Sequence, residues 1–211
     1  MKGYGDEMAK KDGSEDLRIK RTQRAIKDAF YSLVEEKGFE HITVKDITER
    51  AMISRNTFYL HYTDKYDLLN RQCDDLMRTL FFKVGKQLRT VKRTDFTVDG
   101  IAGIISQGIK VVDENKECYR ILLGDVSADI LTTKMTNIVR RSIDYIKKDI
   151  AKLSDFQMEY IVCGMTGLIK YYVTHQVDDI DEECRKFTAL NLYKLIELGE
   201  KIRNEKEKAY N

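Results

Sequence analysis

The chain has 211 residues, with 37 Lys and Arg against 35 Asp and Glu, which leaves a formal net charge of +2. It contains no proline and only 12 glycines, so it lacks the turn residues that β-sandwiches and barrels require. Hydrophobic residues make up 42% of the chain, which is enough for a sizeable core and excludes wholesale disorder. We therefore expect an all-α protein, in which any affinity for nucleic acid must come from the local placement of charge.

The N-terminal part of the chain changes character at Leu17. Residues 1–16 are rich in Gly, Lys, Asp and Glu, and this composition predicts a disordered tail. From Leu17 to Val34 apolar residues recur at helical spacing, and Gly38 stands where a helix commonly ends. A helix is therefore expected over residues 17–37.

Three N-cap residues then predict three helix starts in close succession. These are Thr43 before a helix over 44–51, Ser54 before a helix over 55–61, and Thr63 or Asp64 before a helix that runs from Lys65 through Leu80. A two-residue connection separates the first two of these helices. Two short helices joined by a tight turn, with another helix packed before them, form a helix-turn-helix.

The rest of the chain is predicted to be helical, over 98–113, 117–123, 127–153, 155–176 and 180–203. The last two helices are apolar over a wider arc than one core face needs, notably at 189–198. A monomer would leave this apolar surface exposed, so we expect the last two helices to pair across a two-fold axis in a homodimer.

Side chains suited to DNA recognition lie on the predicted helix 55–61. Phe58 and Tyr62 stand four residues apart and are expected to face the core, which turns the opposite side of the helix outward. Arg55 can bond guanine O6 and N7 in a bidentate fork, and Asn56 can pair with adenine N6 and N7. The other candidates for contact with DNA bases or phosphates are Thr43, Ser54, Thr57, Tyr59, His61 and, at the start of the next helix, Lys65.

The window 43–69, TVKDITERAMISRNTFYLHYTDKYDLL, resembles the DNA-binding domain of the tetracycline-repressor (TetR) family of bacterial transcription regulators. The residues that carry this resemblance are Thr43, Ile47, Ala51, Ser54, Thr57, Tyr59, Tyr62, Lys65 and Leu68. The family usually has Gly in the turn where Met52 stands here, because glycine enters the left-handed region without a Cβ penalty. Asn56 for a usual Gly and Tyr62 for a usual Phe are smaller departures.

The resemblance implies a helix-turn-helix DNA-binding domain over 17–64 and a C-terminal dimerisation and effector-binding domain over 65–211. It also implies a homodimer that binds a palindromic DNA operator, most simply as a repressor released by a small-molecule effector. Residues that offer polar groups among apolar neighbours, and that we expect to line an effector pocket, are Tyr119, Arg120, Cys163, Thr166, Tyr171 and His175. The alternatives are an activator of the same fold and a helical protein-interaction module that has lost DNA binding.

Enzymatic chemistry is not indicated. The sequence has no G-x-S-x-G, phosphate loop or Gly-rich dinucleotide turn, so no cofactor is expected. A small helical enzyme would need a base near a thiol, and none is apparent. The acidic run 178–183 is interpreted as a helix N-terminus and not as a metal site.

The cellular context is predicted from the cysteines and from the apolar segments. The four cysteines lie far apart in no metal or redox spacing, and the N-terminal residues show no signal-peptide pattern, so reduced thiols in a cytoplasm are expected. The most apolar stretch, 156–175, includes Glu159 and Lys170 and is predicted to be a buried helix that does not span a membrane.

Overall fold

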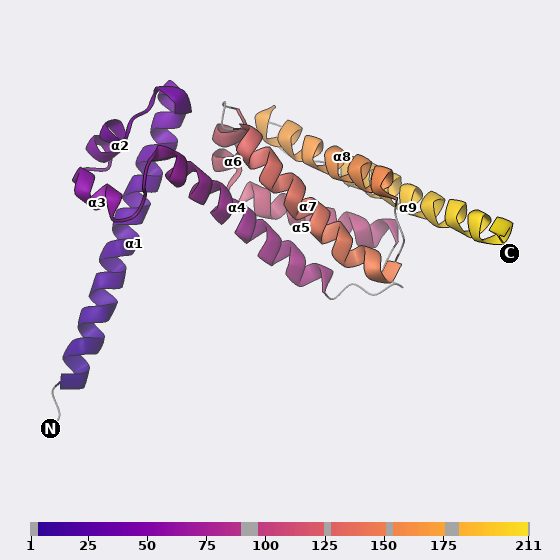
Figure 1. Cartoon of the computed structure of the whole chain (residues 1–211), viewed down its shortest axis with the longest axis horizontal. Coiled ribbons are helices and arrows are strands. Elements are labelled where there is room, and N and C mark those ends of the chain that lie inside the picture. The colour runs from indigo at the N-terminus through magenta and orange to yellow at the C-terminus, as the bar shows by residue number, and fades with distance from the viewer. Residues whose placement is uncertain (1–3, 90–96, 125–127, 151–153, 176–181, 211) are drawn as a thin grey trace. The chain divides into compact units, whose positions relative to one another are not determined.

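A computed structural model of the chain describes residues 4–89, 97–124, 128–150, 154–175 and 182–210. Throughout these ranges the regular elements are all helices, which confirms the predicted all-α fold (Figure 1). In chain order they are α1 (Tyr4–Lys37), the single-turn 3-10 helix η1 (Phe39–His41), α2 (Val44–Arg50), α3 (Arg55–Tyr59), α4 (Lys65–Leu88), α5 (Val98–Asp113), α6 (Lys116–Leu123), α7 (Ala128–Ile150), α8 (Asp155–Thr174) and α9 (Glu182–Tyr210).

The helix starts follow the N-cap signals in the sequence. Thr43 and Ser154 each form a reciprocal capping box with the residue three positions on, and the Ser54 hydroxyl accepts the Thr57 N–H. These bonds satisfy N–H groups that the first turn of a helix leaves without partners. The predicted start of the last helix, at 180, lies outside the described residues. The turn η1 was not predicted.

The N-terminal segment departs from the expectation. α1 begins at Tyr4, within the segment 1–16 that the sequence predicts to be a disordered tail. The segment contains no proline, and a helix satisfies its backbone hydrogen bonds internally, so α1 can continue without an apolar face to bury. Composition alone did not predict this part of the helix.

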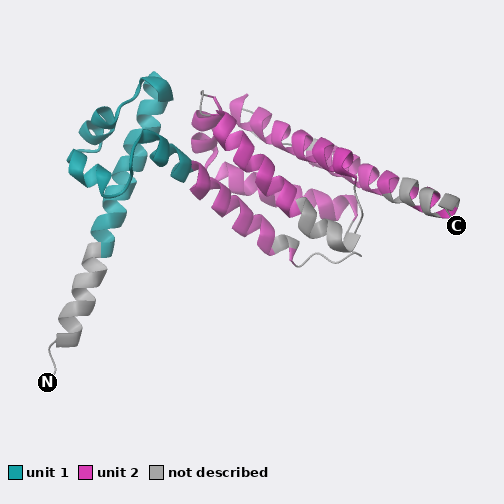
Figure 2. Cartoon of the chain, viewed as in Figure 1, with its two compact units in different colours: residues 1–72 teal, residues 73–211 magenta. Residues whose placement is uncertain are grey.

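The chain divides into two compact units, residues 1–72 and 73–211 (Figure 2). The division falls inside α4 and not at its start, where the sequence placed the boundary. Leu68 and Leu69 explain the difference, because both are fully buried and belong to the first unit. The first turns of α4 are thus part of the core of the first unit.

The core of the first unit is built from residues at helical spacing. Ile26, Phe30 and Leu33 of α1 are buried, as are Ile47 of α2 and Phe58 of α3. Positions 26, 30 and 33 lie on one face of α1, which is the face that the periodicity predicted. Burial of one aromatic or large aliphatic side chain contributes about 1.5–3 kcal/mol, so these contacts dominate the stability of this small unit.

The second unit packs α9 on α5, and α8 on α6 and α7. Its helices are linked by buried polar contacts, in which the Tyr119 hydroxyl donates to the Leu76 carbonyl at 3.4 Å and the Tyr172 hydroxyl donates to Asp113 at 2.5 Å. Burial raises the pKa of Tyr119 well above its ordinary value. In the described part of the chain no helix is long and apolar enough to cross a membrane.

The turn between α2 and α3 keeps a left-handed residue although the chain has no glycine there. Met52 has φ of 53°, and the Met52 and Ile53 N–H groups bond the carbonyls of Glu49 and Thr48 at 3.2 and 3.0 Å. This pair of bonds is the Schellman arrangement that ends many helices. At the end of α1 the residue with a positive φ, of 77°, is Gly38. The tight turn therefore forms here with a side chain in a strained backbone region.

We predict that Met52→Gly raises the free energy of unfolding by about 0.5–1 kcal/mol. Relief of the left-handed strain contributes about 1–2 kcal/mol, and the larger entropy of glycine in the unfolded chain offsets part of it. Met52 is 91% exposed, so little packing is lost with its side chain. Urea unfolding measures the change. Met52→Ala is the matched control, because alanine keeps the Cβ atom, and an equal gain in that variant would contradict this explanation.

Candidate nucleic-acid interface

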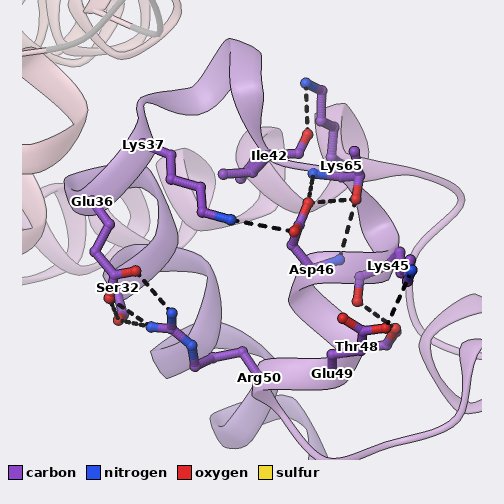
Figure 3. A network of polar contacts seen from close by, with 11 residues as sticks. Ser32, Glu36, Lys37, Ile42, Lys45, Asp46, Thr48, Glu49, Arg50 and Lys65 are labelled. Carbon is purple, nitrogen blue, oxygen red and sulfur yellow. Dashed lines mark hydrogen bonds and ion pairs between the residues drawn. The ribbon is translucent and has the colours of Figure 1, made fainter.

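α2 is attached to α1 by a bidentate ion pair. Arg50 Nη1 and Nη2 donate to the two carboxylate oxygens of Glu36 at 2.7 and 2.8 Å, and Nη1 also donates to the Ser32 hydroxyl at 2.6 Å (Figure 3). The hydrogen bonds from Arg50 and Ser32 lower the pKa of Glu36 to about 2. Because the planar guanidinium matches the carboxylate, the pair fixes direction as well as distance. It therefore orients α2 on α1.

The N-terminus of α2 is held by a second group of polar contacts. The Asp46 carboxylate accepts hydrogen bonds from the Thr43 hydroxyl and N–H, and Lys37 lies 3.4 Å from it. These donors, with Thr43 the largest contributor, lower the pKa of Asp46 to about 2. The structure thus gives the Thr43 hydroxyl a capping function, and its predicted contact with DNA stays a prediction.

α3 has one buried face and one exposed face. Phe58 is fully buried and Tyr62 is nearly so, and their rings lie 5.6 Å apart. The prediction that both face the core is confirmed. With this face inward, Arg55, Asn56 and Tyr59 are exposed.

The exposed face of α3 carries polar groups that are available to a partner. Within the described ranges, the Arg55 guanidinium and the Asn56 amide take part in no side-chain hydrogen bond or ion pair. Ser54 and Thr57 are partly committed, because their hydroxyl oxygens lie 2.8 Å apart. His61 is half-buried beside Tyr62. Residues 54–61 therefore form one short segment, with Arg55 and Asn56 at its N-terminal end.

Two apolar side chains near this face were missed by the sequence analysis. Met52 is 91% exposed, and Leu60 is exposed directly after α3. Each offers aliphatic carbons, which suit contact with a thymine methyl or a sugar. Sequence periodicity held no signal for them, because a large apolar residue in a short segment is ordinarily expected to be buried.

Lys65 has a different environment from the one expected. Its ammonium donates to the backbone carbonyls of Phe39, Glu40 and Ile42, each at 3.0 Å. An ammonium has three N–H groups, so these bonds use all its donors. The ammonium is thus engaged within the first unit, and its predicted contact with a phosphate stays a prediction.

The residues expected to line an effector pocket differ in their exposure. Tyr119 and Thr166 are buried, and the Thr166 hydroxyl donates to the Val162 carbonyl. Cys163, Tyr171 and His175 are exposed on α8, with the last two rings stacked 4.2 Å apart. Arg120 pairs with Glu117 on its own helix. Their assignment to one effector pocket stays a prediction.

Metal-ligating side chains do not cluster in the described part of the chain. Most of the acidic run 178–183, which the sequence predicts to be a helix N-terminus, lies outside the described ranges. The groups that the site offers are hydrogen-bonding side chains and the positive charge of Arg55 on α3.

Comparison with known proteins shows that this segment is similar to bacterial regulatory proteins. The sequence model of "Bacterial regulatory proteins, tetR family" matches residues 26–71, which include α2, α3 and the start of α4. A segment of 55 residues is 34% identical to the HTH-type transcriptional regulator YxbF of Bacillus subtilis and covers 26% of this chain and 14% of that protein. A longer segment of 141 residues is 23% identical to an HTH-type transcriptional regulator of Haemophilus influenzae and covers 66% of each chain.

Solved structures are similar over most of the chain. The TetR transcriptional regulator from Streptococcus agalactiae superposes with a TM-score of 0.61 and 25% sequence identity, over 86% of this chain and 98% of that one. A TetR-family regulator from Streptomyces coelicolor gives a TM-score of 0.62 at 16% identity, over 84% and 95% of the two chains. The second likeness is one of fold alone. Against the curated relatives, by contrast, the chain spans 14% of the Bacillus protein and 66% of the Haemophilus protein.

The lowered pKa of Glu36 predicts a pH-dependent contribution to stability. A carboxylate whose pKa falls on folding stabilises the protein above its unfolded pKa of about 4.5, and this stabilisation is lost as the pH falls toward about 2. The unfolding free energies of the wild type and of Glu36→Gln should therefore differ at neutral pH and converge between about pH 4.5 and 2. Urea unfolding over a pH series measures this convergence.

Glu49→Gln is the control for the pH series. It removes an exposed carboxylate of α2 that lies 3.7 Å from Lys45, without a bidentate partner. An equally large convergence in this variant would contradict the assignment of the effect to the Arg50–Glu36 pair.

Proposed function

We propose that this chain, which belongs to the tetR family of bacterial regulatory proteins, represses transcription as a homodimer bound to a palindromic DNA operator in the bacterial cytoplasm. The observation that carries this proposal is the exposed, hydrogen-bonding N-terminal turn of α3. A recognition helix enters the major groove by its N-terminal end, where side chains meet base edges. Arg55 and Asn56 stand at that end, with donor patterns that match guanine and adenine.

Contacts to the DNA backbone are assigned to the flanks of α3. Tyr59 is exposed and His61 half-buried, and both carry groups that hydrogen-bond a phosphate oxygen. Ser54 and Thr57 share a hydroxyl contact and lie beside the base-reading end. Thr43 carries its hydroxyl at the start of α2 and completes the proposed set. These residues set the position of α3, and Arg55 and Asn56 provide the choice of sequence.

Dimerisation is assigned to the exposed apolar side chains of α8 and α9. Among the described side chains of these two helices, the exposed large apolar residues are Phe156, Tyr160, Leu168, Tyr171, Phe187, Leu190 and Leu198. Gly164 and Gly167 are also exposed, and a Cβ atom added at either would meet nothing within 4 Å. Part of the apolar arc at 189–198 is used within the protomer, since Ala189 and Ile196 are buried. The remaining surface supports a two-fold interface of α8 and α9 from each subunit.

Two alternative functions would use the same surfaces in different ways. An activator of this fold would use the same residues of α3 and differ in where its operator lies relative to a promoter. A protein-interaction module without DNA binding would not need a polar first turn on α3, and Arg55 and Asn56 argue against it. Release by a small-molecule effector acting on the second unit stays a prediction, without an assigned pocket.

The proposal is tested by selecting duplexes from a random-sequence DNA pool with the full chain. We expect an inverted repeat whose half-sites are centred about one helical turn, ~34 Å, or a small multiple apart. Recovery of no common sequence from the pool would contradict specific DNA binding. A single site without a repeat would contradict the dimeric arrangement alone.

Arg55→Ala should weaken binding to the selected duplex by about 1–3 kcal/mol, which is roughly 5–150-fold, and should weaken binding to a scrambled duplex much less. The reason is that a bidentate contact to guanine discriminates between base pairs, whereas contacts to phosphates do not. Fluorescence anisotropy with both duplexes measures the ratio. Arg78→Ala removes an exposed arginine from α4 in the second unit as a control, and an unchanged ratio in Arg55→Ala would exclude base reading by Arg55.

Phe187→Glu should convert the dimer to a species near 24.7 kDa at micromolar concentration, because a charge would enter the apolar interface. Phe82→Glu on α4 is the matched control. The two side chains are 68% and 70% exposed, so neither substitution disturbs a protomer core. Sedimentation velocity compares the variants. A wild-type chain that sediments as a monomer, or a Phe187→Glu variant that stays dimeric, would contradict this interface.

A further inference from the structure

Lys65 is the first residue of α4, and its ammonium is enclosed by backbone oxygens and aromatic rings. The three carbonyl bonds, to Phe39, Glu40 and Ile42, are accompanied by the rings of Phe39 and Tyr66, whose centroids lie 4.8 and 5.4 Å from Nζ. Figure 3 shows the ammonium at the Ile42 carbonyl, beside the network that holds α2. A cation at the N-terminus of a helix opposes the helix dipole. The carbonyls offset this cost with three charge-assisted hydrogen bonds.

The three carbonyls belong to the segment that connects α1 to α2. A single helical turn such as η1 leaves its last carbonyls without partners of its own. Ile42 is followed directly by Thr43, which caps α2. At the other end, Asp64 caps α4, because its carboxylate accepts the Asp67 N–H at 2.7 Å. Segment 43–64 contains α2, the strained turn and α3. The Lys65 side chain, directly after this segment, is therefore hydrogen-bonded to the residues directly before it.

The chemistry of the contact is specific to an ammonium. Its three N–H groups diverge from one nitrogen in a tetrahedral arrangement, and here each has its own carbonyl acceptor. A guanidinium is planar, and its donors are spread over three nitrogens, so it does not reproduce this geometry. For contact with a phosphate, in contrast, arginine serves as well as lysine. The two functions are therefore separable by substitution.

We propose that Lys65 is a positioning residue for DNA recognition, which closes segment 43–64 into a loop and thereby sets the orientation of α3. The effect of Lys65 on DNA recognition rests on the proposed function, whereas the closure of segment 43–64 does not. Without the closure, the segment opens more readily at the start of α2, and Arg55 and Asn56 no longer meet two bases at once. Lys65 contacts no phosphate in this arrangement.

The closure is tested first without DNA, by amide hydrogen exchange of the full chain. Lys65→Met keeps an unbranched apolar stem against the Phe39 and Tyr66 rings and removes the ammonium. We expect the Ile47 N–H, which bonds the Thr43 carbonyl at 3.1 Å, to exchange about tenfold faster, while amides of α8 are unchanged. Lys45→Met removes an exposed ammonium from α2 itself and should leave Ile47 protected. Equal protection of Ile47 in Lys65→Met and the wild type would overturn the closure.

The effect on recognition is then measured with the selected and scrambled duplexes over a range of salt concentrations. Lys65→Met should lose about tenfold in preference for the selected duplex, with no change in the dependence of log Kd on log salt. Lys65→Arg should not restore the preference. A salt slope that falls by about 0.9 per subunit, with recovery in Lys65→Arg, would identify a phosphate contact and overturn the proposal.

The remaining outcomes are also distinct. A preference retained by Lys65→Met, despite faster exchange at Ile47, would reject the positioning of α3. A wild-type chain that prefers neither duplex would reject the proposed function and, with it, the assignment of Lys65 to recognition. In that case the exchange measurement still decides whether Lys65 closes segment 43–64.

Discussion

Burial of Phe58 in the first unit is the constraint on which the recognition surface depends. α3 has five residues, far fewer than an isolated helix needs in water, so its stability comes from packing. Phe58 is fully buried, and Tyr62 continues the same face into the connection to α4. With this face committed to the core, helical geometry leaves Arg55, Asn56 and Tyr59 on the outside. The core contact thus determines which side chains a DNA duplex would meet.

Some basic side chains of the first unit are paired within the fold, and others are accessible to solvent. Arg50 is engaged by Glu36, Lys37 by Asp46, and Lys65 by three carbonyls. On α1, by contrast, Lys20 and Arg24 form exposed pairs one turn apart, which contribute little to stability. A nearly neutral chain can bind an anionic polymer in this way, because some of its cations are committed to folding and others stay accessible to solvent.

The strained turn between α2 and α3 is stabilised by hydrogen bonds and ion pairs of the residues on either side of it. Met52 occupies a left-handed conformation that glycine would adopt without strain, and this turn sets the angle between α2 and α3. The hydrogen bonds of Met52 and Ile53 hold the turn, and the Ser54 cap begins α3 directly after it. The polar contacts of Arg50 and Asp46 hold α2 from the other side. Strain at one exposed residue is therefore tolerated because its neighbours are held by several independent bonds.

Local sequence signals were sufficient to predict most of the helices and most of the exposed face of α3. Caps such as Thr43 and Ser54 act within one turn, and apolar periodicity is a property of one helix, so both can be recognised without knowledge of distant residues. The bounds of α5, Val98–Asp113, and the burial of Phe58 and Tyr62 were obtained in this way. The start of α1 was not predicted from composition, since a helix needs no partner for its backbone.

Contacts between residues far apart in the sequence could not be predicted from local signals, because they depend on how the helices pack. Lys65 bonds carbonyls 23 to 26 positions earlier, and no local pattern distinguishes such a lysine from one that faces solvent. The same holds for the side chains expected to form a pocket, because Tyr119 and Tyr171 have the same chemistry yet one is buried and the other exposed. Exposure and hydrogen-bond partners depend on which helices meet and at what angle, and that is settled by packing of the whole core.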